Sequence, residues 1–138
     1  MKVSIVYFSG YGNTEMISEF LENYFNEKKF EVVRQFVNEE ALIEDADVYC
    51  VGCPAYGVED LEIYSLRPYY ESLKPYLKEK PVVLFGSYDW GGGEWMEKWV
   101  EETLETEPKS VVALSAELAP EESDFKTYQL KLDDVTFS

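Results

Sequence analysis

The sequence predicts an α/β fold in which helices cover both faces of a parallel β-sheet. Short apolar segments alternate along the chain with longer segments whose apolar residues recur every three or four positions, as strands and amphipathic helices do. Some of the short segments are apolar on both faces, which is typical of parallel strands buried between two helical layers. Because the chain has 138 residues, we expect a single domain spanning residues 1–138.

Five strands are expected, because five short runs combine apolar, β-branched and aromatic residues. These runs are residues 3–8, 30–37, 48–52, 81–86 and 111–114. The fourth run begins with Pro81, which a strand tolerates at its first position.

A helix is expected after each strand, from apolar residues at helical spacing. The first carries Ile17, Phe20, Leu21, Tyr24 and Phe25, and a short second helix is expected at residues 41–45. The third carries Leu66, Tyr69, Tyr70, Leu73 and Leu77, with interruptions at Pro68 and Pro75. The fourth carries Met96, Trp99, Val100 and Leu104, and the last carries Phe125, Tyr128, Leu132 and Val135.

The composition excludes several kinds of function. The chain has no histidine, which excludes Ser-His-Asp and Cys-His nucleophiles and histidine-ligated zinc, and we expect neither catalytic residues nor a metal site. A net charge of -16 excludes nucleic acids and anionic membranes as partners and favours proteins with basic patches. With no apolar run of the ~18 residues that span a bilayer and no signal peptide, we expect a cytoplasmic protein.

Ligands of such folds bind beyond the carboxyl ends of the strands, so the loops there are the candidates for a site. The first loop consists of Ser9, Gly10, Tyr11, Gly12, Asn13 and Thr14. Its glycines, its polar side chains and the start of the following helix can hold a phosphate without a cation. An ordinary strand-to-helix turn with Asn13 as the helix cap remains an equal alternative.

The loop after the third strand contains Pro54, Ala55, Tyr56, Gly57, Val58 and Glu59. An aromatic residue at a strand exit can form one wall of a site for a planar ligand, although a surface turn is the simpler interpretation. Just before it, Cys50 and Cys53 match a C-x-x-C motif. On a strand, positions three apart point to opposite faces, so we expect two buried thiols that cannot pair.

The loop after the fourth strand contains Ser87, Tyr88, Asp89, Trp90 and Gly91, within a run that has three consecutive glycines. Trp90 can stack on a flat ring, and the alternative is a flexible loop with Trp90 packed inward. Trp95 and Trp99 lie four positions apart on the next helix and are expected to pack in the core.

Together the three loops resemble those of the flavodoxin family, specifically its short-chain members. The resemblance rests on residues 6–15, 52–57 and 84–96, which read VYFSGYGNTE, GCPAYG and LFGSYDWGGGEWM. It implies a flavodoxin-like five-stranded sheet of order 2-1-3-4-5 and one non-covalently bound FMN.

The resemblance also implies roles for the loop residues. The first loop would hold the phosphate with help from Ser87, and Tyr56 and Trp90 would flank the isoalloxazine. The peptide at Gly57 would flip to bind the flavin N5–H, and Glu59 would accept from the flavin N3–H. Backbone N–H groups from Asp89 to Gly91 would face the flavin O2 and N1 edge.

The function implied is that of a low-potential one-electron carrier between redox enzymes, monomeric and not itself an enzyme. Two alternatives remain: a small FMN-dependent quinone or nitro reductase, and a flavodoxin-like domain with degraded FMN binding. The chain departs from the family pattern at Tyr11, Val58 and Asp89, which could alter the affinity for FMN or its redox tuning.

Overall fold

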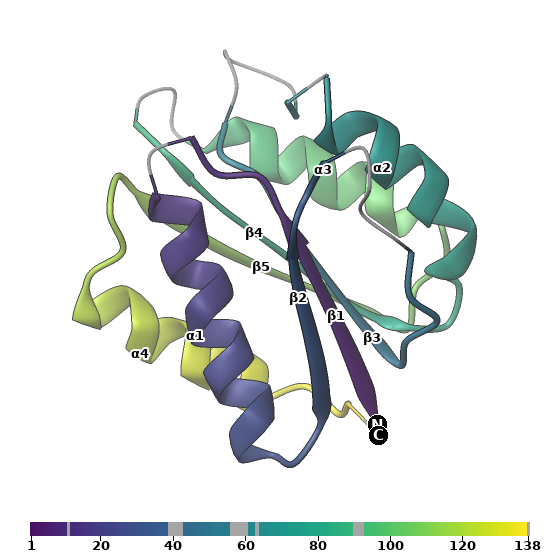
Figure 1. The fold of residues 1–138 in the computed structure, drawn as a ribbon. Helices are drawn as coiled ribbons and strands as arrows, with labels where there is room; N and C mark the ends of the chain where they lie inside the picture. The colour runs from purple at the N-terminus through teal and green to yellow at the C-terminus, as the bar shows by residue number, and fades with distance from the viewer. Residues whose placement is uncertain (11, 39–42, 56–60, 63, 90–92, 138) are drawn as a thin grey trace.

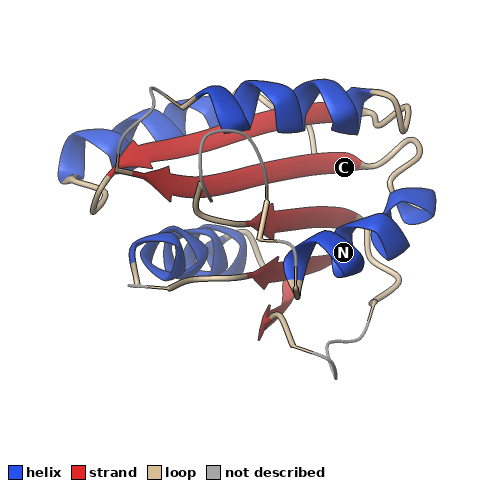
Figure 2. Ribbon diagram, turned by 90° about the horizontal axis from the view of Figure 1, so that it is seen from above, coloured by secondary structure: helices blue, strands red, loops and turns tan. Residues whose placement is uncertain are grey.

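The computed structural model describes residues 1–10, 12–38, 43–55, 61–62, 64–89 and 93–137. Five parallel strands form one sheet of order β2-β1-β3-β4-β5, as expected (Figure 1). The strands are β1 (Lys2–Tyr7), β2 (Glu31–Phe36), β3 (Val48–Gly52), β4 (Pro81–Tyr88) and β5 (Ser110–Glu117). Viewed from above, the sheet has the twist that parallel sheets adopt (Figure 2).

Helices cover both faces of the sheet. They are α1 (Asn13–Glu27), α2 (Leu66–Leu73), the 3₁₀ turn η1 (Lys74–Tyr76), α3 (Glu94–Leu104) and α4 (Glu122–Asp133). Pro68 lies in the first turn of α2, where a helix has no internal partner for the N–H that proline lacks. The interruption expected at Pro68 is therefore wrong. Pro75 does: the α-helix ends before it, and the chain continues as η1.

Two hydrophobic clusters, one on each face of the sheet, form the core. One joins the sheet to α2 and α3 and includes Cys53, Trp95 and Trp99. The other joins the sheet to α1 and α4 and includes Cys50. Neither cysteine forms a disulfide, the two are buried on opposite faces, and both tryptophans are buried, as predicted.

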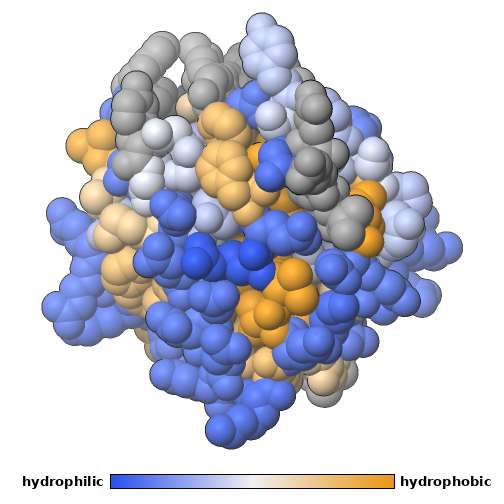
Figure 3. Space-filling view, in the orientation of Figure 1, coloured by the Kyte–Doolittle hydropathy of each residue, from blue (hydrophilic) through white to orange (hydrophobic). Residues whose placement is uncertain are grey.

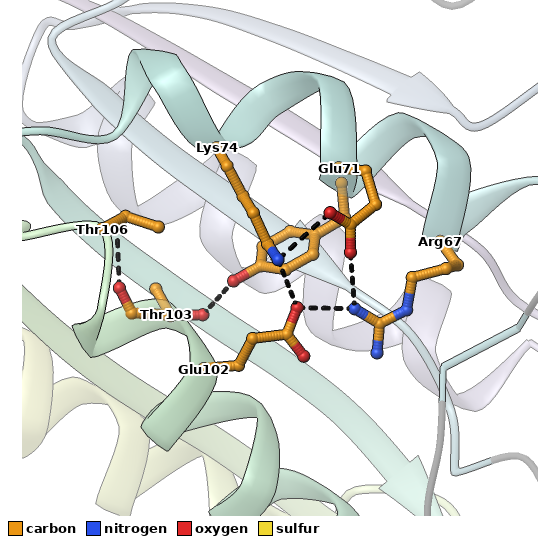
Figure 4. Close-up of polar contacts among 7 residues, drawn as sticks. Arg67, Glu71, Lys74, Glu102, Thr103 and Thr106 are labelled. Carbon is orange, nitrogen blue, oxygen red and sulfur yellow. Dashed lines mark hydrogen bonds and ion pairs between the residues drawn. The ribbon is translucent and has the colours of Figure 1, made fainter.

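Ion pairs hold α2 against α3 on the outside of the first cluster (Figure 4). The Glu102 carboxylate accepts hydrogen bonds from Arg67 at 2.6 Å and from Lys74 at 2.8 Å. Glu71 contacts the same two cations, each at 3.1 Å. One carboxylate from each helix therefore binds both cations, and the four side chains form one network.

The prediction of a short helix at residues 41–45 is wrong for residues 43–45, which are not helical. Residues 41 and 42 lie outside the described part of the chain. The hydroxyl of Tyr49 explains this local conformation. It donates to the Glu44 carbonyl oxygen and accepts from the Ala46 N–H, both at 2.9 Å. These backbone groups thus bind a side chain of β3 instead of forming a helical turn.

The fourth and fifth strands are longer than the sequence predicts. β4 continues past Gly86 to Tyr88, and β5 continues to Glu117, because their ladder extends to the pair Tyr88 and Glu117. Ser87 is therefore a residue of the sheet rather than of a loop, which gives its side chain a fixed position.

The surface is predominantly hydrophilic in the view of Figure 3, with smaller apolar patches between the charged residues. This agrees with 28 acidic and 12 basic side chains in the whole chain. Among the described residues, no helix is long and apolar enough to cross a bilayer.

Candidate functional site

The carboxyl ends of β1, β3 and β4 meet at one edge of the sheet, where α1 also begins (Figure 1). The Thr14 hydroxyl of α1 lies 3.3 Å from the Ser87 hydroxyl of β4, and the Ser87 N–H donates to the same Thr14 oxygen. Both side chains are buried. The first and third candidate loops are thus joined by a pair of polar side chains.

The turn between β1 and α1 is built around Gly12. Gly12 is the N-cap residue of α1 and has φ +94°, which glycine adopts without steric cost. The alternative in which Asn13 caps the helix is wrong, because Asn13 is already the first helical residue. A Cβ added at Gly10 or Gly12 would meet no atom of the described residues within 4 Å, so the backbone here is open with respect to that part of the chain.

The Ser9 hydroxyl oxygen stabilises this turn from inside. It accepts the N–H of Gly12 at 3.0 Å and the N–H of Glu15 at 3.3 Å. Met16 is the first residue of α1 whose N–H donates to a backbone carbonyl oxygen within the helix, that of Gly12, at 3.1 Å. The N–H groups of Asn13 and Thr14 precede that bond, so the helix itself does not use them.

The segment after β3 stays bound to β4 for three more residues. The N–H of Cys53 donates to the Phe85 carbonyl, and the N–H of Ala55 donates to the Ser87 carbonyl, both at 2.9 Å. The two segments approach so closely that a Cβ added at Gly86 would lie 1.9 Å from the Cys53 carbonyl oxygen. Ala55 and Ser87 therefore occupy fixed positions relative to one another.

Glu62 is a buried carboxylate that the sequence analysis missed. Its oxygens accept the N–H groups of Tyr64, Ser65 and Leu66 at 2.8–2.9 Å, at the start of α2. These are the donors that a helix leaves without internal partners, and an anion at that end also matches the helix dipole. An acidic residue shortly before an apolar helical pattern was the available signal.

Arg34 is the second residue that the sequence analysis missed. It lies on β2, and its guanidinium reaches the Tyr7 hydroxyl at 3.3 Å and the Ser18 hydroxyl of α1 at 3.1 Å. Its Nε lies 3.4 Å from a Glu22 carboxylate oxygen. A cation therefore lies beside the second and third turns of α1, brought there by the pairing of β1 with β2 rather than by any local motif.

Comparison with known proteins identifies the family. A family model described as flavodoxin matches residues 5–135. This chain belongs to the flavodoxin family. The flavodoxin of Megasphaera elsdenii is 42% identical over 107 residues, which cover 75% of this chain and 77% of that one. The flavodoxin of Clostridium beijerinckii is 37% identical over 101 residues, covering 72% and 73%.

Solved structures agree with this family assignment. The two-electron reduced flavodoxin of Megasphaera elsdenii matches with a TM-score of 0.76 at 36% identity, covering 90% of this chain and 93% of that chain. Oxidised flavodoxin 1 from Bacillus cereus matches with a TM-score of 0.81 at 22% identity, covering 99% and 100%, which supports the fold alone.

The flavodoxin fold thus brings together part of the predicted site. Ser9, Gly10, Gly12, Asn13 and Thr14 lie at one turn, which Ser87 joins. Pro54 and Ala55 follow β3 and are half-buried, Tyr88 is half-buried and packs against Trp95, and Asp89 is exposed. Seven predicted residues lie outside the part of the chain that the structure describes: Tyr11, Tyr56, Gly57, Val58, Glu59, Trp90 and Gly91.

Metal-ligating clusters are absent from the part of this flavodoxin that the structure describes. No group of three or more His, Cys, Asp or Glu side chains there could hold a metal ion.

Proposed function

We propose that this flavodoxin is a low-potential one-electron carrier that binds FMN non-covalently at the carboxyl edge of its sheet. The observation that supports this best is the 3.3 Å contact between Thr14 and Ser87. It joins the glycine turn to the end of β4, so polar groups from two segments meet beside the start of α1. The similarity to named flavodoxins supports the carrier over a self-contained quinone or nitro reductase.

The residues at the turn suit a phosphate ester. The N–H groups of Asn13 and Thr14 are not used by the helix, and the helix dipole favours an anion at that point. Ser9 uses its oxygen as an acceptor within the turn, which leaves its hydroxyl proton to donate. Between Thr14 and Ser87 one hydroxyl proton makes the shared bond, and the other is left to donate.

Bound FMN supplies the electron-transfer chemistry, and the protein supplies orientation and electrostatics. In our proposal the turn from Ser9 to Thr14 holds the phosphate with Ser87. Tyr56 and Trp90 stack on the ring system, and Glu59 accepts a hydrogen bond from it. These last three roles rest on the resemblance of the loop sequences.

The test is the absorption spectrum together with ligand preference. We expect the purified protein to be yellow and to turn blue on partial reduction. Titration calorimetry of the apoprotein should give a much higher affinity for FMN than for riboflavin, because riboflavin leaves the donors of the turn to water. A colourless protein that binds neither compound would refute the proposal, and equal affinities would refute the phosphate site.

We further propose that the carrier acts as a cytoplasmic monomer of one domain and meets redox partners through their basic docking patches. The net charge of -16 supports docking to basic patches, because attraction between opposite charges accelerates the encounter of two proteins. The rate of electron transfer to a reductase should fall as salt rises to about 0.5 M, where charges are strongly screened. A rate that does not depend on salt would exclude electrostatic docking.

A further inference from the structure

The side chain of Arg34, on the edge strand β2, contacts residues of both β1 and α1. Its guanidinium binds two hydroxyls and one carboxylate on neighbouring elements and lies 5.7 Å from the centre of the Tyr7 ring. About three-quarters of its side chain is buried, since 24% remains exposed. Its position and orientation are therefore defined from several sides.

The Tyr7 hydroxyl connects Arg34 to the first turn of α1. It donates to a Glu15 carboxylate oxygen at 2.9 Å and accepts from Arg34 at 3.3 Å. Burial, followed by the hydrogen bond to Glu15, raises the pKa of Tyr7, so its hydroxyl stays protonated and donates. Ser18 forms a parallel connection, because it accepts from Arg34 and donates to the Glu15 backbone carbonyl at 2.6 Å.

The charge of Glu15 makes this connection matter for an anion. Glu15 is the third residue of α1, and its N–H belongs to the same turn as the N–H groups of Asn13 and Thr14. A carboxylate there stabilises the helix but repels a phosphate bound at the same end. Among the described residues, Arg34 is a cation that contacts the second turn of α1 through Ser18 and the third turn through Glu22, and the chain has no Lys or Arg from position 3 to 27.

We propose that Arg34 is a positioning residue for the FMN phosphate: through Tyr7 and Ser18 it holds Glu15 in place and offsets its charge. This inference rests on the proposed function and extends it. Arg34 thereby contributes to the preference for FMN over riboflavin, although it belongs to β2 and lies outside the glycine turn.

The experiment measures dissociation constants of the apoprotein for FMN and for riboflavin at low and high salt. Arg34→Gln should weaken FMN binding by about five- to tenfold at low salt, the scale of one lost charge under partial screening, and should leave riboflavin binding within about twofold. The FMN defect should shrink at high salt. Arg34→Lys should recover part of the FMN affinity, since it restores the charge without the planar guanidinium.

Two further variants separate this role from a structural one. Arg67→Gln removes the same charge from the α2–α3 network and should leave both affinities unchanged. Glu15→Gln removes the repelling charge, so it should tighten FMN binding and reduce the effect of Arg34→Gln in the double variant. These comparisons are made on variants whose far-ultraviolet circular dichroism matches the wild type.

The outcomes distinguish this inference from the proposed function. If Arg34→Gln weakens FMN and riboflavin binding equally, or weakens neither, Arg34 only ties β2 to α1 and the inference is wrong, while FMN binding by the wild type stands. If the wild-type apoprotein binds no FMN, the proposed function and the inference are both wrong.

Discussion

The hydroxyls of Thr14 and Ser87 lie 3.3 Å apart although 73 positions separate them in the chain. Thr14 belongs to the first turn of α1 and Ser87 to the end of β4, and both are buried at the edge where ligands of parallel sheets bind. In our proposal this buried hydroxyl pair contributes both to packing and to FMN binding, and substitution separates the two contributions.

We expect Ser87→Ala to weaken FMN binding by about 1–3 kcal/mol, the value of a hydrogen bond to a charged group. The stability of the apoprotein should fall by only about 1 kcal/mol, because the backbone N–H of residue 87 still donates to Thr14. Fluorescence titration and urea unfolding measure the two effects. The control is Ser72→Ala on the exposed side of α2, and unchanged FMN affinity would remove Ser87 from the site.

Alanine at Gly86 should reduce the stability of the protein, whereas alanine at Gly10 should reduce its affinity for FMN. At Gly86 the new methyl would meet the Cys53 carbonyl oxygen at 1.9 Å, so Gly86→Ala should destabilise the protein by at least about 2 kcal/mol. At Gly10 the new methyl meets no atom within 4 Å in the part of the chain that the structure describes, so Gly10→Ala should change apoprotein stability by less than about 0.5 kcal/mol. Gly10→Ala should instead reduce FMN affinity, because the methyl occupies the open side of the turn. Equal stability losses would contradict this account.

Glu102 should make the stability of the fold depend on pH in the acid range below 4.5. Burial alone would raise its pKa, but the hydrogen bonds from Lys74 and Arg67 outweigh burial and hold the pKa below its ordinary 4.5. The network therefore stabilises the fold fully above pH 4.5, and this stabilisation is lost as pH falls through the lower pKa of the folded state. Glu102→Gln should cost about 1 kcal/mol at pH 7 and progressively less in acid.

Thermal unfolding from pH 7 to pH 3 measures the difference between wild type and Glu102→Gln. The matched control is Glu101→Gln, which removes the same charge from an exposed position of α3 and relieves the same general repulsion. If the two variants follow the same pH curve, the network contributes nothing specific.

Trp90→Ala should weaken FMN binding by about 1–3 kcal/mol, through lost stacking and lost buried area. This prediction comes from the loop sequence, since Trp90 lies outside the described residues. Tyr76→Ala serves as the control, because it removes a partly exposed aromatic ring from η1, beyond the far end of α2. Equal FMN affinities of wild type and Trp90→Ala would assign Trp90 to packing.

The sheet could be predicted from the sequence because its signal is local. The central strands of an α/β protein with helices on both faces of its sheet are buried on both sides, and an apolar run such as residues 48–52 needs no partner to be recognised. The helix expected at 41–45 is wrong for residues 43–45 because the hydroxyl of Tyr49, a few residues further along, binds the backbone of Glu44 and Ala46, and the apolar pattern does not reveal this contact. The extra length of β4 depends on pairing with β5, which a single segment does not reveal.

The site could be predicted only in part, for a related reason. The turn could be predicted from the residue types and the order of Gly10, Gly12 and Thr14. Arg34 gives no such signal, because an arginine in an edge strand is ordinary and its meaning depends on the register that sets it opposite Ile5, two residues from Tyr7. The use of Ser9 as an acceptor inside the turn is likewise a matter of three-dimensional geometry.

The two thiols face opposite sides of the sheet and therefore cannot store electrons as a dithiol that cycles with a disulfide. Cys50 packs under α1 and α4, Cys53 packs under α2 and α3, and burial raises the pKa of the Cys50 thiol, so neither the geometry nor the acidity favours a disulfide. With FMN bound as proposed, a reductive titration should end at the two equivalents that the flavin itself accepts. The C-x-x-C motif then adds no hidden capacity, and repeated cycles in air should leave the same thiol count at the end as at the beginning.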